Sequence, residues 1–321
     1  SDNYKNILRS QTNAAAIPAE VTVRYGVTVR RANLRNLPTG EGLFFYASDR
    51  NFDALQETAL DPGEAVAILH TSTNGYFYSV QAYNYRGWLS KFDVAETDRS
   101  TWLRYAEPKN FLTVVAKDYT LKADGAQVLF QQGARLQLAD KKASAYTVKV
   151  PVRTKEGKLQ EEKVVLAANA SLHEGYLPYT TNNIIRSAFK FYDSVYGWGG
   201  LQQSVDCSSF ISNAYRTVGI FLPRNADEQE TSAGIHKKMG NMNSAQRANV
   251  IKGLTPGSTL HMDGHVMLYL GSSNEIPYAI HSLGSHYTGG TRHSVMKVVV
   301  SDLNLQKSNG NTYLDELTTC V

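Results

Sequence analysis

Near the middle of the chain the sequence reads Tyr196-Gly-Trp-Gly-Gly200 and, shortly afterwards, Asp206-Cys-Ser-Ser-Phe210. Apolar residues between Phe210 and Val218 recur at helical spacing, and Gly219 offers a C-terminal stop, so a helix is expected to begin near Cys207. Unsatisfied amide donors and the helix dipole at such a position favour thiolate over thiol. The pattern predicts an activated nucleophile, although a lone cysteine on an apolar helix face is by default a small buried hydrophobic residue.

Two downstream histidines occupy the positions that a cysteine nucleophile requires. His265 stands directly before four apolar residues, which predict a strand that begins there. A second strand is expected over Tyr278 to Ser282, and a hairpin turning around Ser272 to Ile276 would bring His265 and His281 together on one face. His281 would then orient His265, which would act as a base toward Cys207.

The other histidines are weaker candidates for a functional site. His261 and His265 are four residues apart, but the residues between them lack a helical pattern, which disfavours a zinc pair. His286 and His293 fall in a Gly- and Ser-rich stretch and are expected at the surface, with His286 as the reserve candidate for the orienting role. No metal and no organic cofactor is implied.

Length and composition predict a folded chain of more than one domain. Its 321 residues exceed what one small core usually supports, and the apolar fraction of 42% is sufficient for buried cores. The net charge of +4 comes from Lys and Arg scattered along the sequence, which excludes the electrostatic footprint of a nucleic-acid binder. No apolar run is long enough for membrane insertion. The expected partners therefore include neither nucleic acid nor membrane.

The first half of the chain has the pattern of two small all-β domains. Short alternating stretches separated by Pro-, Gly- and Asn-containing turns run from about Val21 to Val94, and the size fits a barrel of the SH3 kind. Its expected strands include Val21–Val23, Val27–Val29 and Phe77–Val80, with Tyr85–Leu89 resembling the terminal strand of bacterial SH3-like modules. The strands expected in the second block are Leu112–Val115, Ala134–Leu138 and Tyr146–Val152, with a turn at Glu156-Gly157.

After Leu172 the periodicity becomes helical. A helix is expected over Asn182 to Tyr196, capped by Thr181 or Asn182. Its apolar stripe would comprise Ile185, Ala188, Phe189, Tyr192 and Val195, and a late strand is expected over Val295–Val300.

Two cysteines, Cys207 and Cys320, exclude a disulfide framework. Cys320 is expected to be a thiol on a frayed tail. The opening residues Ser1 to Tyr4 lack the features of a signal peptide. A chain from which a leader had been removed would begin in the same way, so these residues do not determine the cellular compartment.

Four segments together resemble the NlpC/P60 family of papain-like cysteine peptidases, which cleave peptidoglycan stem peptides. They are Tyr196–Gly200, Asp206–Phe210, Leu222–Gln229, and Gly264–Gly271 with Ile280–Ser282. Upstream stretches between Arg24 and Trp88 resemble the first SH3b domain of multidomain members. The resemblance implies an α+β fold with a papain-like NlpC/P60 catalytic domain preceded by two small all-β SH3-like barrels. The expected boundaries are an N-terminal arm over 1–20, barrels over 21–100 and 105–172 with a polar linker over 96–110, and a catalytic domain over 173–321.

In that family Cys207 would be the nucleophile, His265 the general base and His281 the third polar residue, while the Tyr196 hydroxyl and the Cys207 backbone amide would hold the oxyanion. Members with this architecture resemble γ-D-glutamyl-L-diamino acid endopeptidases that favour a free N-terminal L-alanine. The residues implied in substrate binding are Tyr196, Trp198, Asp206, Ser208 and Arg224, with Glu57 and Tyr85 from the first barrel, or Asp53 and Tyr76 as their rivals.

One departure from the family pattern concerns the amine preference. Relatives often show Arg-Asp-Ser where this chain has Arg224-Asn-Ala226, so a serine that could contact the substrate is missing. The alternatives left open are an N-acetylmuramoyl-L-alanine amidase or acyltransferase on the same fold, and a non-catalytic wall-binding protein. The expected partner is peptidoglycan stem peptides or muropeptides, the expected state a monomer, and the expected location the bacterial envelope, periplasmic or secreted, with cytoplasmic recycling as the other possibility.

Overall fold

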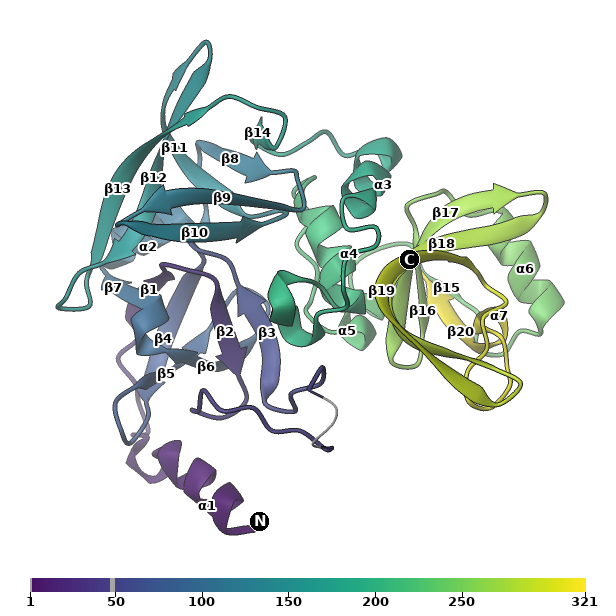
Figure 1. Ribbon diagram of the computed structural model, residues 1–321, viewed down its shortest axis with the longest axis horizontal. Coiled ribbons are helices and arrows are strands. Elements are labelled where there is room, and N and C mark those ends of the chain that lie inside the picture. Colours follow the sequence, from purple (N-terminus) through teal and green to yellow (C-terminus); the bar gives the residue numbers. More distant parts are fainter. Residues whose placement is uncertain (1, 47–49) are drawn as a thin grey trace. The chain divides into compact units, whose positions relative to one another are not determined.

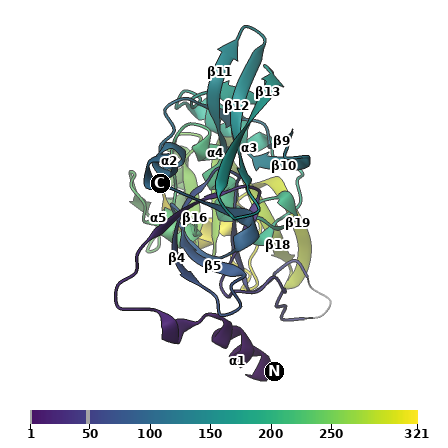
Figure 2. The same ribbon diagram turned by 90° about the vertical axis from the view of Figure 1, so that its left-hand side faces the viewer.

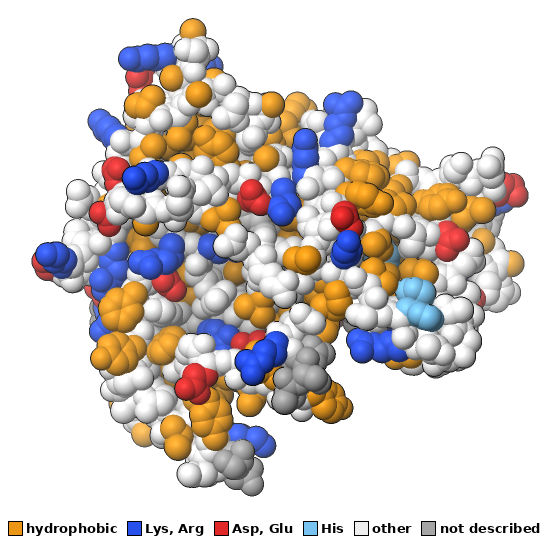
Figure 3. Space-filling view, viewed as in Figure 1, with side chains coloured by type: hydrophobic (Ala, Val, Ile, Leu, Met, Phe, Trp, Pro, Cys, Tyr) orange, Lys and Arg blue, Asp and Glu red, His pale blue; other side chains and the backbone are white. Residues whose placement is uncertain are grey.

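The computed structural model describes residues 2–46 and 50–321 and divides the chain after Tyr176 into two compact units. Both units are mixed in secondary structure, as the α+β expectation requires, with short helices beside antiparallel sheets (Figure 1). In the described residues no helix is both long and apolar enough to span a membrane. Lys and Arg side chains are spread over the face seen in Figure 3 rather than gathered in one patch.

The first unit begins with a helix and an antiparallel sheet of seven strands in the order β3-β2-β6-β5-β4-β1-β7. Its elements are α1 (Asp2–Gln11), the 3₁₀ helix η1 (Ala14–Ala16), β1 (Arg24–Thr28), β2 (Ala32–Arg35), β3 (Gln56–Leu60), β4 (Ala65–Thr71), β5 (Phe77–Gln81), β6 (Arg86–Ser90), η2 (Lys91–Asp93) and β7 (Val94–Thr97). The expected strand over 21–23 is wrong, because regular pairing starts only at Arg24. Within the described residues the edge strands β3 and β7 are not paired with each other, so the sheet is not a closed barrel.

The expected polar linker contains a helix, α2 (Arg99–Ala106). Asp98 caps it by accepting a hydrogen bond from the Thr101 amide at 2.9 Å. Trp102 packs its ring 5.4 Å from that of Tyr25 and donates its indole N–H to the Val66 carbonyl at 3.0 Å. The stretch that was expected to be a polar linker therefore contains a short helix whose Trp102 contacts the sheet.

The second β-rich block follows within the same unit. Its strands are β8 (Phe111–Val114), β9 (Asp118–Ala123), β10 (Ala126–Gln131), β11 (Arg135–Lys142), β12 (Ala145–Arg153), β13 (Leu159–Ala167) and β14 (Leu172–Glu174). They form a β9–β10 pair and a sheet in the order β13-β12-β11-β8-β14, and the predicted strands and the turn at Gly157 are confirmed. Figures 1 and 2 show the tips of β11, β12 and β13 projecting from this block.

The second unit carries a six-stranded antiparallel sheet in the order β15-β20-β16-β17-β18-β19. Its elements are α3 (Thr181–Phe189), the 3₁₀ segment η3 (Trp198–Gln203), α4 (Cys207–Arg216), α5 (Ala226–Glu230), β15 (Lys237–Lys238), α6 (Ser244–Lys252), β16 (Thr259–Met262), β17 (His265–Ser273), β18 (Ile276–Thr288), β19 (Thr291–Asp302), α7 (Tyr313–Glu316) and β20 (Leu317–Cys320). The helix predicted from Cys207 and the three late strands are confirmed.

Two apolar layers sandwich this sheet. Val266 and Leu268 of β17 face α3 and α4, where they meet Phe210 and Ile211. Met267 and Tyr269 of β17 lie on the other side of the sheet, where they pack with Ile251 of α6 and Tyr313 of α7. Cys320 belongs to that second layer: it is 1% exposed within β20, so the expectation of a frayed tail is wrong. Strand pairing with β16 and apolar packing hold it in place.

Helix α3 is shorter than its periodicity predicts. It is capped by Thr180 and ends at Phe189, and its buried face is formed by Ile184, Ser187 and Ala188. Ala188 belongs to the expected stripe, whereas Phe189, Tyr192 and Val195 of that stripe are exposed. The chain then leaves the helix because Asp193 adopts φ 61° and its amide bonds to the Val298 carbonyl at 2.9 Å. Pairing with β19 therefore replaces about the last two turns of the expected helix.

Candidate active site

Cys207 is the first residue of α4 and is fixed there by a reciprocal cap. The Asp206 carboxylate accepts the Ser209 amide at 2.9 Å, and the Ser209 hydroxyl accepts the Asp206 amide at 3.0 Å. Cys207 is half-buried, and the backbone amides of Val266 and Ser208 lie close enough to its sulfur to act toward a lower pKa of the thiol. The N-terminus of α4 thus places the sulfur beside the start of β17, directly after His265.

The thiol of the free protein is not activated in the way that its position predicts. Burial, together with the Asp206 carboxylate, raises the pKa of Cys207 to about 12, although the Val266 and Ser208 amides and Arg224 act in the opposite direction. The helix terminus alone does not overcome the apolar surroundings. Thiolate formation therefore requires transfer of the proton to a base rather than a permanent charge on sulfur.

The two histidines lie in contact at the edge of the sheet. His265 Nε2 is 2.7 Å from His281 Nδ1. The predicted hairpin is present, with its turn at Asn274 and Glu275. A bulge between Tyr269 and Gly271 shifts its register, so that Leu268 pairs with Ile280. His281 is therefore the diagonal neighbour of His265 rather than its directly opposite partner.

A third residue, Ser301 on β19, completes a polar chain. Its hydroxyl oxygen lies 3.0 Å from His281 Nε2. Burial lowers the pKa of His265 to about 4 and that of His281 well below its ordinary value, so both rings are neutral near pH 7. Only one of two facing nitrogens in a neutral pair carries a proton.

The direction of the hydrogen bonds that run from His265 through His281 to Ser301 determines whether His265 can act as a base. When His281 Nε2 donates to Ser301, His281 Nδ1 accepts from His265 Nε2–H, and His265 Nδ1 is left free to accept a proton. When Ser301 donates instead, every proton in the chain is reversed and His265 Nδ1 is already occupied. Ser301 as an acceptor thus selects the tautomer of His265 that can act as a base.

Tyr313 on α7 holds both imidazoles from one side. Its ring centre is 6.1 Å from each of the two histidine rings, in edge-on geometry. Tyr313 and Ser301 are not among the residues predicted from the sequence. Ser301 follows the expected strand 295–300 directly, so extending that strand and pairing it with the His281 strand could have found it, whereas nothing local to Tyr313 signals its role.

We expect Ser301→Ala to lower the turnover of any hydrolysis at this site by about 10- to 100-fold, because the tautomer of His265 is no longer fixed. KM should stay unchanged, since the hydroxyl bonds to His281. Steady-state kinetics on Ser301→Ala and Ser301→Thr checks this, because threonine keeps the hydroxyl and suits a strand. Equal losses in both variants would reduce Ser301 to a packing role.

Asp206 and Arg224 form a buried ion pair behind Cys207. The Arg224 Nη2 to Asp206 Oδ2 distance is 2.5 Å, and Arg224 also donates to the Ser208 hydroxyl at 2.8 Å. Asp206 Oδ2 accepts the Gly199 amide at 3.0 Å as well, which ties the glycine-rich turn to α4. Arg224 lowers the pKa of Asp206 against the effect of burial, so the carboxylate stays ionised. The predicted substrate residues Asp206, Ser208 and Arg224 are therefore bonded to one another.

The glycine-rich turn places its two aromatic residues differently. Tyr196 is buried, and burial together with the neighbouring Cys207 and Asp206 raises the pKa of its hydroxyl. Trp198 begins η3 and is partly exposed. At Gly197 an added Cβ would lie 2.3 Å from the Leu201 carbonyl oxygen, so only glycine fits. Tyr196 therefore lies near both Cys207 and Asp206.

In the first unit, the structure brings together two of the four candidates for amine recognition. The Tyr85 hydroxyl donates to the Glu57 carboxylate at 2.6 Å, and Asn36 donates to the same group at 2.9 Å. Asp53, by contrast, is buried in an ion pair with Arg35 at 2.5 Å. Tyr76 is exposed beneath the Lys91 ammonium, 5.0 Å from its ring centre.

The remaining histidines lie outside this arrangement. His261 Nε2 is 2.9 Å from the Thr259 hydroxyl. His286 and His293 face each other across the β18–β19 hairpin with ring centres 5.2 Å apart. The residue beside His265 is thus His281 rather than the reserve candidate His286. Among the described residues, no three His, Cys, Asp or Glu side chains are grouped so as to hold a metal ion.

Comparison with known proteins agrees with this architecture. Residues 193–299 match the NlpC/P60 family model, and residues 43–90 match the model of an SH3 domain of the SH3b1 type. No curated protein matches the chain significantly.

Two solved structures are similar over most of the chain. An NlpC/P60 endopeptidase from Photobacterium damselae subsp. piscicida has a TM-score of 0.82 at 20% identity, covering 100% of this chain and 78% of that one. An NlpC/P60 family protein from Bacillus cereus has a TM-score of 0.66 at 16% identity, covering 92% of this chain and 98% of that one. At these identities the likeness establishes a shared fold. The chain therefore contains a domain of the NlpC/P60 family, preceded by an SH3 domain of the SH3b1 type.

Proposed function

We propose that this protein is a cysteine endopeptidase that hydrolyses the γ-D-glutamyl-L-diamino acid bond of peptidoglycan stem peptides. The observation that carries the proposal is the 2.7 Å contact between His265 and His281. His265 begins β17, and the backbone amide of the next residue, Val266, lies near the Cys207 thiol. The NlpC/P60 match over residues 193–299 and the endopeptidase among the similar structures support the peptidase class.

In the proposed reaction, His265 accepts the Cys207 proton as sulfur attacks the carbonyl carbon of the γ-glutamyl amide. In the described chain no hydrogen bond joins the thiol to His265, and such contacts commonly tighten only when substrate binds. The Cys207 backbone amide and the Tyr196 hydroxyl stabilise the oxyanion. His265 then protonates the leaving amine, the C–N bond breaks, and water hydrolyses the thioester to release the acid and regenerate the thiol.

The substrate preference that we propose is for a free N-terminal L-alanine. The Glu57 carboxylate, held by Tyr85 and Asn36, is a fixed anion that suits an ammonium group. Asp206 already accepts hydrogen bonds from Arg224, Gly199 and Ser209, so Glu57 is favoured as the principal partner of the amine. We further propose a bacterial envelope location, a monomer, and the domain boundaries 21–100, 105–172 and 173–321.

The test uses L-Ala-γ-D-Glu-meso-diaminopimelate and its N-acetylated form, with products identified by mass. We expect release of L-Ala-γ-D-Glu from the free peptide and little from the blocked one, with Glu57→Gln losing this discrimination. Equal cleavage of both peptides would remove the amine preference and keep the peptidase. Hydrolysis of the acetyl–L-alanine amide of the blocked peptide, which stands in for the muramoyl–L-alanine bond, would favour the amidase, and no cleavage by the parent would overturn the proposal.

The pH dependence of this hydrolysis follows from the neutral histidines. Because burial lowers the pKa of His265 to about 4, the base stays unprotonated as the pH falls through 6.5, and kcat/KM should decline only near pH 4. The unfolded chain binds its histidine protons near pH 6.5, so folding stability also decreases between pH 6.5 and 4. Circular dichroism at each pH separates the two effects, and an acid limb centred at 6.5 in folded protein would contradict the expectation.

A further inference from the structure

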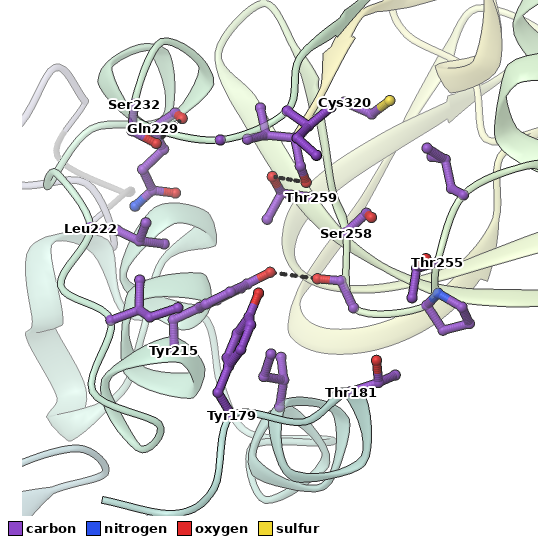
Figure 4. A pocket seen from close by; sticks show the side chains of 18 of the residues that line it. Tyr179, Thr181, Tyr215, Leu222, Gln229, Ser232, Thr255, Ser258, Thr259 and Cys320 are labelled. Carbon is purple, nitrogen blue, oxygen red and sulfur yellow. Dashed lines mark hydrogen bonds between the residues drawn. The ribbon is translucent and has the colours of Figure 1, made fainter.

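A second pair of histidines lies near the turn of the β18–β19 hairpin. His286 and His293 are directly paired across the two strands, and their ring centres lie 5.2 Å apart at an interplanar angle of 23°. His286 is half-buried and His293 is exposed. Neither lines the pocket of about 730 Å³ shown in Figure 4, across which the Tyr215 hydroxyl donates to the Gly257 carbonyl at 2.5 Å. The pair is therefore a separate feature of the second unit.

One contact favours a single tautomer of His286. Its Nδ1 lies 3.4 Å from the Tyr287 carbonyl oxygen, and because a carbonyl only accepts, Nδ1 carries the proton in this hydrogen bond. The lone pair of the neutral ring is then on Nε2. Histidines that bind metal ions commonly donate their other ring nitrogen to a backbone carbonyl in this way. His286 is thus oriented as a metal ligand through Nε2.

The separation of the two rings suits bonds to one metal ion. With metal–nitrogen bonds of about 2.0 Å and bond angles between roughly 90° and 180°, two imidazoles have ring centres roughly 4.5–6.5 Å apart. The 5.2 Å separation of His286 and His293 falls within this range. The rings are nearly parallel, so one of them must turn toward the ion. His293 can do so because it is exposed and the χ2 torsion of histidine is broad.

The strand alternation keeps positive charge of the hairpin away from this pair. Within residues 285–294, all of them described, Arg292 is the single Lys or Arg. It lies on the opposite face of the hairpin, where its Nε donates to the Ser285 hydroxyl at 3.1 Å. The face of the histidines continues toward the turn with the paired Thr288 and Thr291. The hairpin itself therefore places no cation beside the two imidazoles.

We infer that His286 and His293 together bind one divalent ion of the late first transition series, with water in the remaining positions. Imidazole nitrogen suits Cu²⁺, Ni²⁺ and Zn²⁺, and of these Cu²⁺ binds most tightly. Because both ligands belong to one hairpin, the second bond forms within the molecule. The same two strands carry His281 and Ser301, so a bound ion ties together the strands that hold them. The inference does not depend on the proposed hydrolysis.

The test is calorimetric titration of the full chain, without an affinity tag and carrying Cys207→Ala, which removes the half-buried thiol as a competing ligand. The probes are Cu²⁺, Zn²⁺ and Mg²⁺ in a weakly coordinating buffer at neutral pH. We expect one tightly bound Cu²⁺ per chain, weaker binding of Zn²⁺, and no binding of Mg²⁺, which requires oxygen ligands.

Three further substitutions in this background locate the ion. His286→Gln and His293→Gln should each weaken Cu²⁺ binding by about 100-fold, because each leaves a single imidazole. His236→Gln, which removes an exposed histidine of the same unit, should leave the affinity unchanged. Electron paramagnetic resonance of the bound Cu²⁺ should show coupling to two imidazole nitrogens in the parent and fewer in the two hairpin variants. Without metal, all three variants should keep the thermal unfolding midpoint of the parent, which separates loss of a ligand from loss of the fold.

Three results would overturn the inference. The first is no saturation by Cu²⁺ up to about 1 mM, the weak limit of specific binding. The second is an affinity for Cu²⁺ that neither hairpin substitution changes, which would place the ion elsewhere on the chain. The third is Mg²⁺ binding as tight as that of Cu²⁺, which would indicate oxygen ligands. Because the readout is metal binding to a protein without its proposed nucleophile, its failure is distinct from a failure to cleave the stem peptide.

Discussion

Cys207→Ala should abolish hydrolysis of the stem peptide, with a loss of roughly 10⁴-fold or more, while the fold stays intact. The thiol is the group that we propose forms the covalent intermediate, and the flanking cap of α4 is made by Asp206 and Ser209, which the substitution leaves in place. Product release followed by mass, together with the thermal unfolding midpoint, checks both parts.

Cys320→Ala is the matched control for this experiment. It removes the other thiol of the chain, which belongs to β20 and is buried in the apolar layer on the face of the sheet away from α4. We expect full hydrolytic activity and a small loss of stability, about 1 kcal/mol or somewhat more, from the cavity left behind. If Cys320→Ala were inactive and Cys207→Ala active, the nucleophile would be misassigned.

Arg224→Met should destabilise the second unit by about 3–5 kcal/mol, because it leaves the Asp206 carboxylate buried without its counter-charge. The same substitution removes the donor to the Ser208 hydroxyl. Urea unfolding of the full chain at pH 7, followed by a probe in the second unit, measures the effect.

Two further variants make this result specific to the ion pair. Asp206→Asn in the Arg224→Met background should recover part of the loss, since asparagine is neutral and still caps a helix. Arg186→Met, on the exposed side of α3, should change stability by no more than about 0.5 kcal/mol. A loss in Arg224→Met no larger than in Arg186→Met would show that the pair contributes little.

Local patterns were sufficient for the elements around the nucleophile. The apolar spacing after Phe210 and the stop at Gly219 predicted α4, and the alternation after His265 predicted β17, because each pattern is satisfied by packing on one face. The α3 terminus was mispredicted, since an apolar stripe cannot reveal that β19 will compete for the backbone near Asp193.

The identity of the site residues could be predicted from the sequence, but the pKa of the thiol could not. A helix terminus predicts a lowered thiol pKa, but the net shift depends on how apolar the surroundings are and on Asp206, which sequence spacing does not quantify. Ser301 and Tyr313 reach the histidines only through the tertiary fold. The pairing of His265 with His281 was predicted, although its register was not.

That register has a practical consequence for inserting a label. The bulge between Tyr269 and Gly271 separates the hairpin into a portion that holds the histidines, fixed by the pairing of Leu268 with Ile280, and an outer portion that ends at Asn274 and Glu275. Lengthening the outer portion leaves the inner register unchanged. An epitope or a fluorophore-binding loop can therefore be inserted between Asn274 and Glu275 to report on this unit without moving the imidazoles apart.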